Sequence, residues 1–403
     1  MNKKKIILIG YDFDLEKSTG DKSFWKENIK FLSNELKEIL VLNIQSKKRS
    51  SSSFLLGNCH VKIFNVKPVI MDKFQSKHGV STRFWENSLI PTFARLIEKT
   101  VDGIKISQVL KKLGSSFQFN HIHLMDNFGL ANRIIVNSLK TNFSVSAVTY
   151  KGLYELVYDN FLKLSYGMSK AKVVCRSIDF ANKLKIIGIP EYRILHIPWG
   201  IHVNEKDLPK NKAWMKKRLG LPSDIPLYLW SGYIQPLGQK DFLFAFEAAK
   251  IAVEKGLKAV FYFAFKPESM DYKITKMADQ INNIYISATT NDEFRKILRA
   301  ADAFYCPIKN QNAILAPPLT WIEALGLGVP ILTSLSGGVE EVIQPGKTGF
   351  IAKNKEELIK FLFIMPNHFA DMRESCLKKV KEKYNIEEIA KKYLFLFTQE
   401  YDL

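Results

Sequence analysis

The sequence predicts an α/β protein built of two doubly wound, Rossmann-like domains that face each other across a cleft. Short apolar runs rich in Ile, Val and Phe alternate with longer amphipathic segments, which is the pattern of strands and crossover helices in parallel sheets. The length of 403 residues exceeds the roughly 250–300 residues at which a single hydrophobic core stops growing. A stretch rich in charges and turn-forming residues between Pro198 and Pro226 is the expected linker.

In the first half, the alternation begins with the apolar run KIILIG after three lysines, which is too short for a signal peptide or a membrane span and predicts a first strand. A Ser-rich basic patch at residues 47–53 predicts a mobile loop. The predicted elements are strand 5–10, helix 24–40, strand 60–64, helix 86–113, strands 121–125 and 144–149, helix 153–167, strand 172–175, helix 179–188 and strand 193–198.

The second half repeats the pattern and ends in helices from residue 355 onward. We expect one domain at residues 1–200, a second at 201–385, and a last helix at 386–403 that crosses back to the first domain. The predicted elements are strand 227–232, helix 242–256, strands 258–265 and 284–286, helix 292–300, strand 303–307, helix 319–326 and strands 329–334 and 348–352.

The charge balance is the unusual feature of the composition. Apolar residues at 46% and charged residues at 25% are ordinary for a globular protein, but a formal charge of +19 with a pI near 9.5 calls for anionic partners. Nucleic acid, a phosphate-rich membrane surface and phosphorylated small molecules all fit. Four cysteines without a CxxC pair indicate neither zinc nor redox chemistry and fit a reducing cytoplasm.

One short stretch, LAPPLTWIEALGLGVP at residues 315–330, holds a single acidic side chain, Glu323. Pro317 and Pro318 stop a helix before them, so a helix can begin at Leu319 or Thr320, and its N-terminus suits a phosphate or diphosphate. The spacing from Thr320 to Glu323 is also that of a capping box. Glu323 is therefore either a cap of its own helix or a ligand-binding carboxylate.

The segment from Ala301 to Ile351 resembles the donor-binding region of retaining GT-B glycosyltransferases of the family-four type. It shares with them an AD-strand start, a Glu-Ala pair on the following helix, a Gly-x-Pro strand and a GG-x-x-E turn. The stretches at residues 18–36, 170–201 and 231–250 resemble other parts of that family more weakly.

The resemblance implies a fold and a reaction. It implies the GT-B fold and transfer of a sugar, with retention, from a nucleotide-diphosphate donor in the C-terminal domain to an acceptor in the N-terminal domain. The donor is a co-substrate of unknown base, and no cofactor or metal is required.

The resemblance also assigns roles to residues. Glu323 matches the glutamate that binds the ribose hydroxyls, and Leu319 and Thr320 match the backbone N–H groups that hold the diphosphate. The positions expected to bind the donor or to take part in catalysis either match the family's motifs or are lysines close to them. They are Gly232, Tyr233, Lys266, Pro318, Leu319, Thr320, Glu323, Gly338 and Glu341 for the donor, and Lys151 and Lys240 for catalysis.

Four positions depart from the family. Leu315 stands where its first glutamate grips the sugar, Tyr233 and Gly238 stand in place of its phosphate-clamping Arg and Lys, and Lys151 replaces its N-domain His. The lost cations would neutralise a leaving diphosphate. Lys240, Lys266 and Lys151 can return positive charge by another route, although a solvated surface lysine is the more ordinary interpretation of each.

Two further motifs leave alternatives open. His121, His123 and Asp126 have the spacing of a metal site, yet a structural or substrate-facing role is the expected one. A run with Trp85, Phe84, Phe93 and Leu96 beside Arg83, Arg95 and Lys99 fits either a basic membrane-touching surface or an ordinary core helix.

Three classes of function follow. The favoured one is a cytoplasmic glycosyltransferase acting on a glycan, lipid-linked or other anionic acceptor, compatible with a peripheral contact with the inner face of an anionic membrane. The alternative is a catalytically degenerate subunit that partners an active glycosyltransferase or binds glycans. Nucleic-acid binding rests on charge alone, without a recognisable motif, and an epimerase of the same fold matches the linker and donor segment less well.

Overall fold

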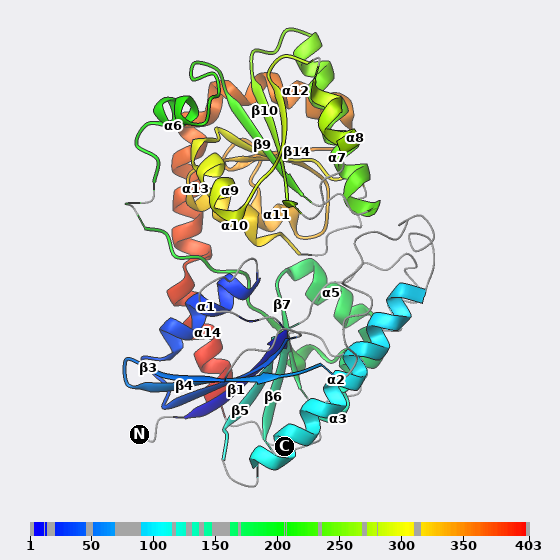
Figure 1. The fold of residues 1–403 in the computed structure, drawn as a ribbon, viewed down its shortest axis with the longest axis vertical. Helices are drawn as coiled ribbons and strands as arrows, with labels where there is room; N and C mark the ends of the chain where they lie inside the picture. The colour runs from blue at the N-terminus through cyan, green and yellow to red at the C-terminus, as the bar shows by residue number, and fades with distance from the viewer. Residues whose placement is uncertain are drawn as a thin grey trace. The chain divides into compact units, whose positions relative to one another are not determined.

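A computed structural model confirms the predicted α/β class with two Rossmann-like parallel sheets (Figure 1). The chain forms two compact units: unit 1 comprises residues 1–199 and 386–403, and unit 2 comprises residues 200–385. The structure describes residues 4–11, 13, 21–45, 51–68, 90–114, 118–125, 131–136, 141–146, 162–167, 171–204, 206, 208–232, 236–267, 272–279, 281–309 and 316–399.

Unit 1 is built on an eight-stranded sheet with the order β3-β4-β2-β1-β5-β6-β7-β8. Every described pair is parallel except β3 with β4. The strands are β1 (Lys5–Tyr11), β2 (Glu38–Ile44), β3 (Ser52–Leu56), β4 (Cys59–Val66), β5 (His121–Leu124), β6 (Asn142–Ser146), β7 (Lys172–Cys175) and β8 (Ile194–His196).

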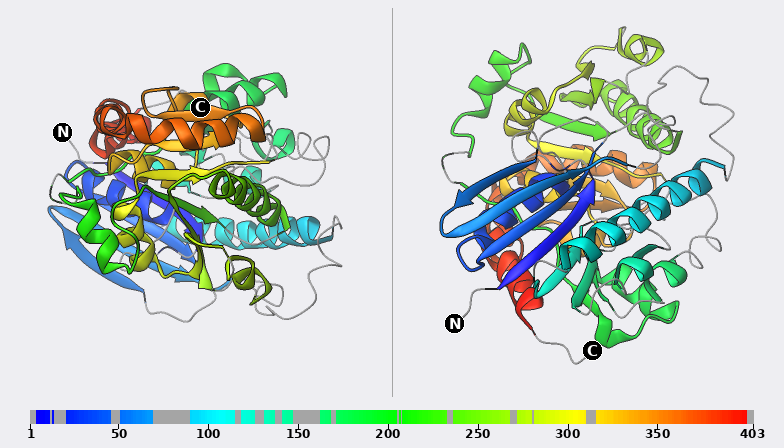
Figure 2. Two further views of the ribbon diagram at one scale, coloured as in Figure 1. Left: turned by 90° about the horizontal axis from the view of Figure 1, so that it is seen from above. Right: turned by 60° about the horizontal axis from the view of Figure 1, so that its bottom comes forward.

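The helices of unit 1 pack in pairs, α1 with α14 and α2 with α3. Figure 2 shows the long helix α2, in cyan, running alongside the strands of its sheet, where the Tyr11 hydroxyl donates to the Asp102 carboxylate at 3.1 Å. The helices are α1 (Asp21–Leu32), α2 (Ile90–Gly114), α3 (Ala131–Val136), the π-turn η2 (Lys163–Gly167), α5 (Ile178–Ile186), the 3₁₀ turn η3 (Glu191–Arg193) and α14 (Ile386–Thr398).

Three expectations for the chain are corrected. The helix expected at residues 24–40 ends at Leu32, and Glu38–Ile44 forms β2, because its continuous apolar run lies buried along its whole length in the middle of the sheet. Ser52 and Ser53, assigned to a loop, belong to β3, which pairs with β4 as an edge strand. The stretch read as a linker lies in unit 2 and contains a helix, α6 (Lys212–Arg218).

Helix α6 is attached to unit 2 by charge. The ammonium of Lys216 lies 2.5 Å from the Asp302 carboxylate, and that of Lys212 lies 3.7 Å from it. Asp302 also accepts the N–H of Leu227 at 2.9 Å, so one carboxylate joins α6 to the start of β9. Burial lowers the pKa of Lys212 to about 8, and Asp302 opposes that shift.

Unit 2 contains a six-stranded parallel sheet with the order β11-β10-β9-β12-β13-β14. This is the order 3-2-1-4-5-6 of a doubly wound nucleotide-binding fold. The strands are β9 (Leu227–Gly232), β10 (Val260–Phe265), β11 (Ile284–Ala288), β12 (Ala303–Cys306), β13 (Ile331–Ser334) and β14 (Gly349–Ala352). Besides α6, the helices are α7 (Pro236–Glu254), α8 (Tyr272–Thr275), the 3₁₀ turn η6 (Lys276–Ala278), α9 (Asn291–Ala300), α10 (Leu319–Gly326), α11 (Val339–Val342), α12 (Lys355–Ile364), the 3₁₀ turn η8 (Met365–His368) and α13 (Phe369–Lys383).

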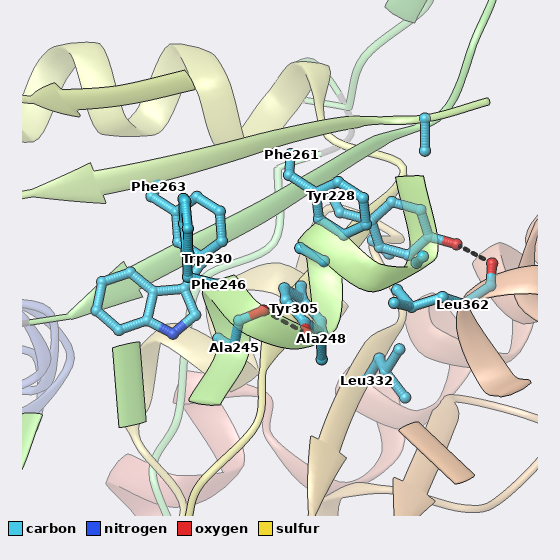
Figure 3. Packing of buried hydrophobic residues seen from close by; sticks show 14 of the residues in the cluster. Tyr228, Trp230, Ala245, Phe246, Ala248, Phe261, Phe263, Tyr305, Leu332 and Leu362 are labelled. Carbon is cyan, nitrogen blue, oxygen red and sulfur yellow. Dashed lines mark hydrogen bonds between the residues drawn. The ribbon is translucent and has the colours of Figure 1, made fainter. Parts of the chain in front are cut away.

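The core of unit 2 is rich in aromatic rings, and two of them are tyrosines whose buried hydroxyls are hydrogen bonded (Figure 3). The Tyr228 hydroxyl donates to the Leu362 carbonyl at 2.9 Å, and the Tyr305 hydroxyl donates to the Ala245 carbonyl at 2.9 Å. Buried hydroxyls without partners would destabilise the core. These two bonds instead fasten α12 and α7 to the sheet.

The chain enters and leaves unit 2 through adjacent segments. Ile201 pairs with Asn385 as an isolated parallel bridge, and the Ile201 N–H donates to the Tyr384 carbonyl at 2.9 Å. Ile201 also packs on the end of α10, where a Cβ added to Gly326 would lie 2.4 Å from its Cδ1 atom. Gly326 therefore permits a close approach between the entering segment and α10.

We expect Gly326→Ala to destabilise unit 2 by about 1–3 kcal/mol, since an added methyl overpacks a buried contact. Thermal unfolding of the full chain measures the effect. The double variant with Ile201→Val should recover part of the loss, because it shortens the opposing side chain. A Gly326→Ala protein as stable as the parent would contradict the close approach.

Candidate functional site

The strand order of unit 2 identifies the edge of the sheet where a ligand would bind. The order reverses between β9 and β12, and doubly wound sheets bind ligands outside the carboxyl ends of their strands at such a point. Gly232 ends β9 and Cys306 ends β12. Burial raises the pKa of the Cys306 thiol to about 12, so this cysteine is not a thiolate nucleophile.

Helix α10 follows β12 and begins at Leu319, directly after two prolines. Its N-cap is Pro318, which has an extended backbone and no side chain able to cap. The first N–H groups of a helix have no carbonyl partner within it, and those of Leu319 and Thr320 have none among the described residues. The helix thus presents two backbone donors and its positive dipole end.

Thr320 and Glu323 lie on the accessible side of α10. Both are half-buried, as is Leu327, whereas the other described positions from Leu319 to Gly326 are buried. Residues three and four apart share one face of a helix, so the Thr320 hydroxyl and the Glu323 carboxylate point to the same side. The capping-box interpretation of Glu323 is wrong, because the N-cap is Pro318 and makes no side-chain cap bond.

The Glu323 carboxylate makes no hydrogen bond or ion pair within the described part of the chain. Burial raises its pKa above the ordinary glutamate value, and the positive charge of Arg295 on α9 opposes that rise. A carboxylate that is partly desolvated and lacks a partner is suited to accept hydrogen bonds from a ligand.

Side chains from two other elements fix the segment that leaves β12. The Ile308 N–H donates to Ser334 Oγ at 3.1 Å, and the Lys309 N–H donates to Asp241 Oδ1 at 2.7 Å. Ser334 ends β13, and Asp241 lies in the second turn of α7. Sequence reasoning missed this role of Asp241. The sequence signal for it was an acidic residue, Asp241, three positions after Gly238 and near the start of a long apolar helix.

The GG-x-x-E turn lies at the carboxyl end of β13. Gly338 adopts a left-handed conformation with φ of 74° and is the N-cap of α11, and the Glu341 carbonyl accepts the Tyr384 hydroxyl at 3.0 Å. Ser336 Oγ is buried and finds no hydrogen-bond partner among the described residues. These contacts support a loop-forming role for the turn, and its contact with a donor stays a prediction.

The remaining expected residues of unit 2 differ in their surroundings. Gly232 lies opposite Phe265 of β10, so Lys266, one residue further and half-buried, is at the same edge of the sheet. A Cβ at Gly232 would lie 2.4 Å from the Trp230 ring, so a larger residue there would require the ring to move. Lys240 is exposed in the first turns of α7.

Several expected residues fall outside the described part of the chain: Lys151, Tyr233, Leu315, Asp126, Arg83, Phe84 and Trp85. Phe93, Arg95, Leu96 and Lys99 lie in α2, whose side chains are described only from Thr100 onward.

The two histidines of β5, His121 and His123, are structural in this arrangement. Ser144 Oγ lies 2.7 Å from His121 Nε2 and 2.6 Å from His123 Nδ1, and Ser146 Oγ lies 3.0 Å from His123 Nε2. Burial lowers the pKa of His121 to about 3 and that of His123 well below its usual range. Within the described residues no group of three or more His, Cys, Asp and Glu side chains could hold a metal.

Comparison with known proteins identifies the domain. Residues 226–362, which run from β9 into α12, match the family model described as Glycosyl transferases group 1. The chain carries a glycosyl transferases group 1 domain. The expected resemblance is thereby confirmed for these residues, while the roles expected of the residues on α10 stay predictions.

Two curated relatives are similar to parts of the chain. A probable sucrose-phosphate synthase of Thermosipho melanesiensis is 25% identical over 182 residues, which are 44% of this chain and 42% of that protein. A GDP-mannose-dependent monoacylated alpha-(1-6)-phosphatidylinositol monomannoside mannosyltransferase of Corynebacterium glutamicum is 23% identical over 166 residues, or 40% of this chain and 43% of that protein. The matches thus span less than half the length of these relatives.

Solved structures agree over nearly the whole chain. Sucrose-phosphate synthase from Thermosynechococcus elongatus has a TM-score of 0.72 with 15% identity and covers 98% of both chains. The Anabaena protein HepE, in complex with UDP-glucose, has a TM-score of 0.65 with 11% identity and covers 97% of this chain and 98% of its own. These likenesses confirm the GT-B fold for the glycosyl transferases group 1 domain and its companion unit.

Replacing the unpaired acid tests its electrostatic state. Because the pKa of Glu323 is raised in the folded protein, its ionisation destabilises the fold above that pKa, and the penalty vanishes below the ordinary value of 4.5. Glu323→Gln should therefore raise Tm by about 1–4 °C at neutral pH and by nothing near pH 4. Calorimetry across this pH range checks the prediction; a gain that persists in acid would contradict it.

Substitutions at Asp241 test whether the contact with Lys309 orders the segment after β12. Asp241→Ala removes the acceptor and should weaken nucleotide binding about tenfold, whereas Asp241→Asn keeps an oxygen acceptor and should lose little. Titration calorimetry measures both. Equal losses in the two variants would assign the effect to charge and not to the hydrogen bond.

Proposed function

We propose that the protein transfers a sugar, with retention, from a nucleotide-diphosphate donor bound by unit 2 to an acceptor bound by unit 1. One observation carries the proposal: in a glycosyl transferases group 1 domain, the half-buried Glu323 carboxylate has no partner among the described residues and lies one turn from the free N–H groups of α10. The two features match the two ends of a nucleoside diphosphate.

The chemistry of each part supports this assignment. A carboxylate accepts hydrogen bonds from two vicinal ribose hydroxyls, and the backbone donors of Leu319 and Thr320, with the helix dipole, stabilise a diphosphate. Charge develops on that diphosphate as the sugar leaves. Lys240, Lys266 and Lys151 are the lysines we assign to neutralise it, without a metal ion or other cofactor.

For the acceptor we propose a glycan or a lipid-linked or otherwise anionic sugar, met at the cytoplasmic face of a membrane. The formal charge of +19 supports an anionic acceptor, and the Corynebacterium glutamicum relative is named for a phosphatidylinositol mannoside. Among the described residues, no helix is long and apolar enough to span a bilayer. The membrane contact that we propose is a peripheral one.

A second candidate is a degenerate subunit that binds glycans or partners an active glycosyltransferase. It is favoured by the sequence at Gly238, which is a glycine on α7 where the family carries a phosphate-clamping lysine, and by the replacements at Tyr233, Leu315 and Lys151. Such a subunit would neither transfer nor hydrolyse a nucleotide sugar.

Titration calorimetry against UDP, GDP, ADP, TDP and CMP and their common sugar conjugates tests the donor site. We expect one nucleotide to bind and Glu323→Ala to weaken it at least about tenfold, the loss of a charge-assisted hydrogen-bond pair. Glu254→Ala, an exposed acid at the end of α7, is the matched control and should bind as the parent does.

Hydrolysis of the bound nucleotide sugar then separates the two candidates. A transferase leaks sugar to water in the absence of acceptor, and the degenerate subunit does not. Binding that is unchanged in Glu323→Ala would overturn the ribose assignment.

A further inference from the structure

Unit 1 exposes an unusual pair of large apolar side chains. Ile186, the last residue of α5, is 84% exposed and Tyr192 of η3 is 73% exposed, higher fractions than those of the other large apolar residues described. Leu164 of η2 is 47% exposed. Single exposed apolar residues are common on soluble proteins, so what matters is whether these three share one surface.

Hydrogen bonds hold the three elements together. Lys185 forms an ion pair with Glu191, and Ile186 and Tyr192 each follow one member of that pair in the sequence. The buried Arg193 donates to the carbonyls of Tyr166 at 2.7 Å and Gly167 at 3.3 Å, which attaches η2 to η3. The elements that carry the three apolar side chains are therefore joined to one another, and their exposed side is called here the α5–η3 surface.

Lysines are frequent on and beside these elements. Lys172 donates to the Tyr192 carbonyl at 2.7 Å, and its ammonium lies 5.6 Å from the centre of the Tyr192 ring. Lys163 of η2 and Lys183 of α5 add two more positive charges, against the two acids of these elements, Asp179 of α5 and Glu191 of η3. The whole of unit 1 has the same bias: it holds 33 of the 59 Lys and Arg residues and 20 of the 40 Asp and Glu residues, a formal charge of +13.

We propose that the α5–η3 surface contacts an anionic lipid bilayer, with Ile186, Tyr192 and Leu164 entering the headgroup region and the lysines facing lipid phosphates. Tyr is suited to a membrane interface because its ring is apolar and its hydroxyl stays hydrated. Lysines near an anionic bilayer add favourable electrostatic energy, and their long stems reach the headgroups. The inference rests on the proposed function, which calls for an acceptor at a membrane.

Sedimentation of the full chain with vesicles tests the proposal. We expect binding to phosphatidylcholine vesicles that contain phosphatidylglycerol, weaker binding to phosphatidylcholine alone, and loss at high salt. Ile186→Ser with Tyr192→Ser should lower the partition coefficient about tenfold. Lys163→Gln with Lys183→Gln should lower it only for the anionic vesicles.

The matched control is Leu55→Ser with Phe395→Ser, which removes two apolar side chains, each 63% exposed, elsewhere in unit 1 and should bind vesicles as the parent does. Equal binding by the control and the Ile186 and Tyr192 variant would overturn the proposal. A second result would also overturn it: the parent protein does not bind vesicles, and light scattering shows a dimer that Ile186→Ser disrupts. A second copy of the chain would then cover this surface.

Nucleotide calorimetry on the same samples keeps the two proposals apart. If vesicles fail to bind while a nucleotide binds, only the α5–η3 assignment fails. If vesicles bind and no nucleotide does, the membrane surface stands and the transferase assignment fails.

Discussion

The burial of the Glu323 carboxylate at the edge of an otherwise apolar helix is the constraint on which the candidate site depends. Desolvation of an acid destabilises a fold unless a partner compensates for it. Among the described residues Glu323 has no hydrogen bond or ion pair, and only the positive charge of Arg295 opposes this cost. Unit 2 offsets this cost through packing: Leu319, Trp321, Ile322, Ala324, Leu325 and Gly326 of α10 are all buried. The acid is held in place by apolar contacts on the other faces of its helix, so its oxygens remain available.

Three polar side chains beside the site, those of Asp241, Ser334 and Thr333, differ from Glu323 because each is hydrogen bonded within the protein. Asp241 and Ser334 accept backbone N–H groups, and Thr333 Oγ1 donates to the Cys306 carbonyl at 2.6 Å. These bonds order the carboxyl ends of β12 and β13 without using the groups that would meet a ligand. Rigid backbone beneath an available carboxylate is the combination that positions a substrate with little entropic loss.

In unit 1, by contrast, several buried polar side chains are hydrogen bonded to one another or packed on aromatic rings. Neutral His121 and His123 share Ser144, and the Arg176 guanidinium lies over the rings of Trp199 at 4.3 Å and Phe24 at 4.6 Å. Rings of α1 and α14 close over the two histidines. His121 and His123 have the spacing of a metal site because alternate residues of a strand point to the same face of the sheet. On that face they contact Ser144 and Ser146.

The sequence predicted local features well and long-range ones poorly. Helix α10 was expected at residues 319–326 and has those bounds, because Pro317 and Pro318 restrict the backbone whatever surrounds them. Strand β2 was missed, since a continuous apolar run does not by itself distinguish a buried strand from a helix. The bond from Lys309 to Asp241 joins residues 68 positions apart, and no local pattern announces it. The capping box failed for the same reason: spacing identifies a motif, but the backbone at Pro318 decides where the cap is.

The bridge between Ile201 and Asn385 makes unit 2 a domain inserted into unit 1. Its two ends meet, with the N–H of Ile201 2.9 Å from the carbonyl oxygen of Tyr384, and unit 1 resumes with α14, which packs against α1. An insert whose ends touch can be exchanged, duplicated or permuted without stretching the host. Evolution could therefore replace unit 2 as a whole, and the same junction offers a natural point for building chimaeras in which unit 2 comes from another protein.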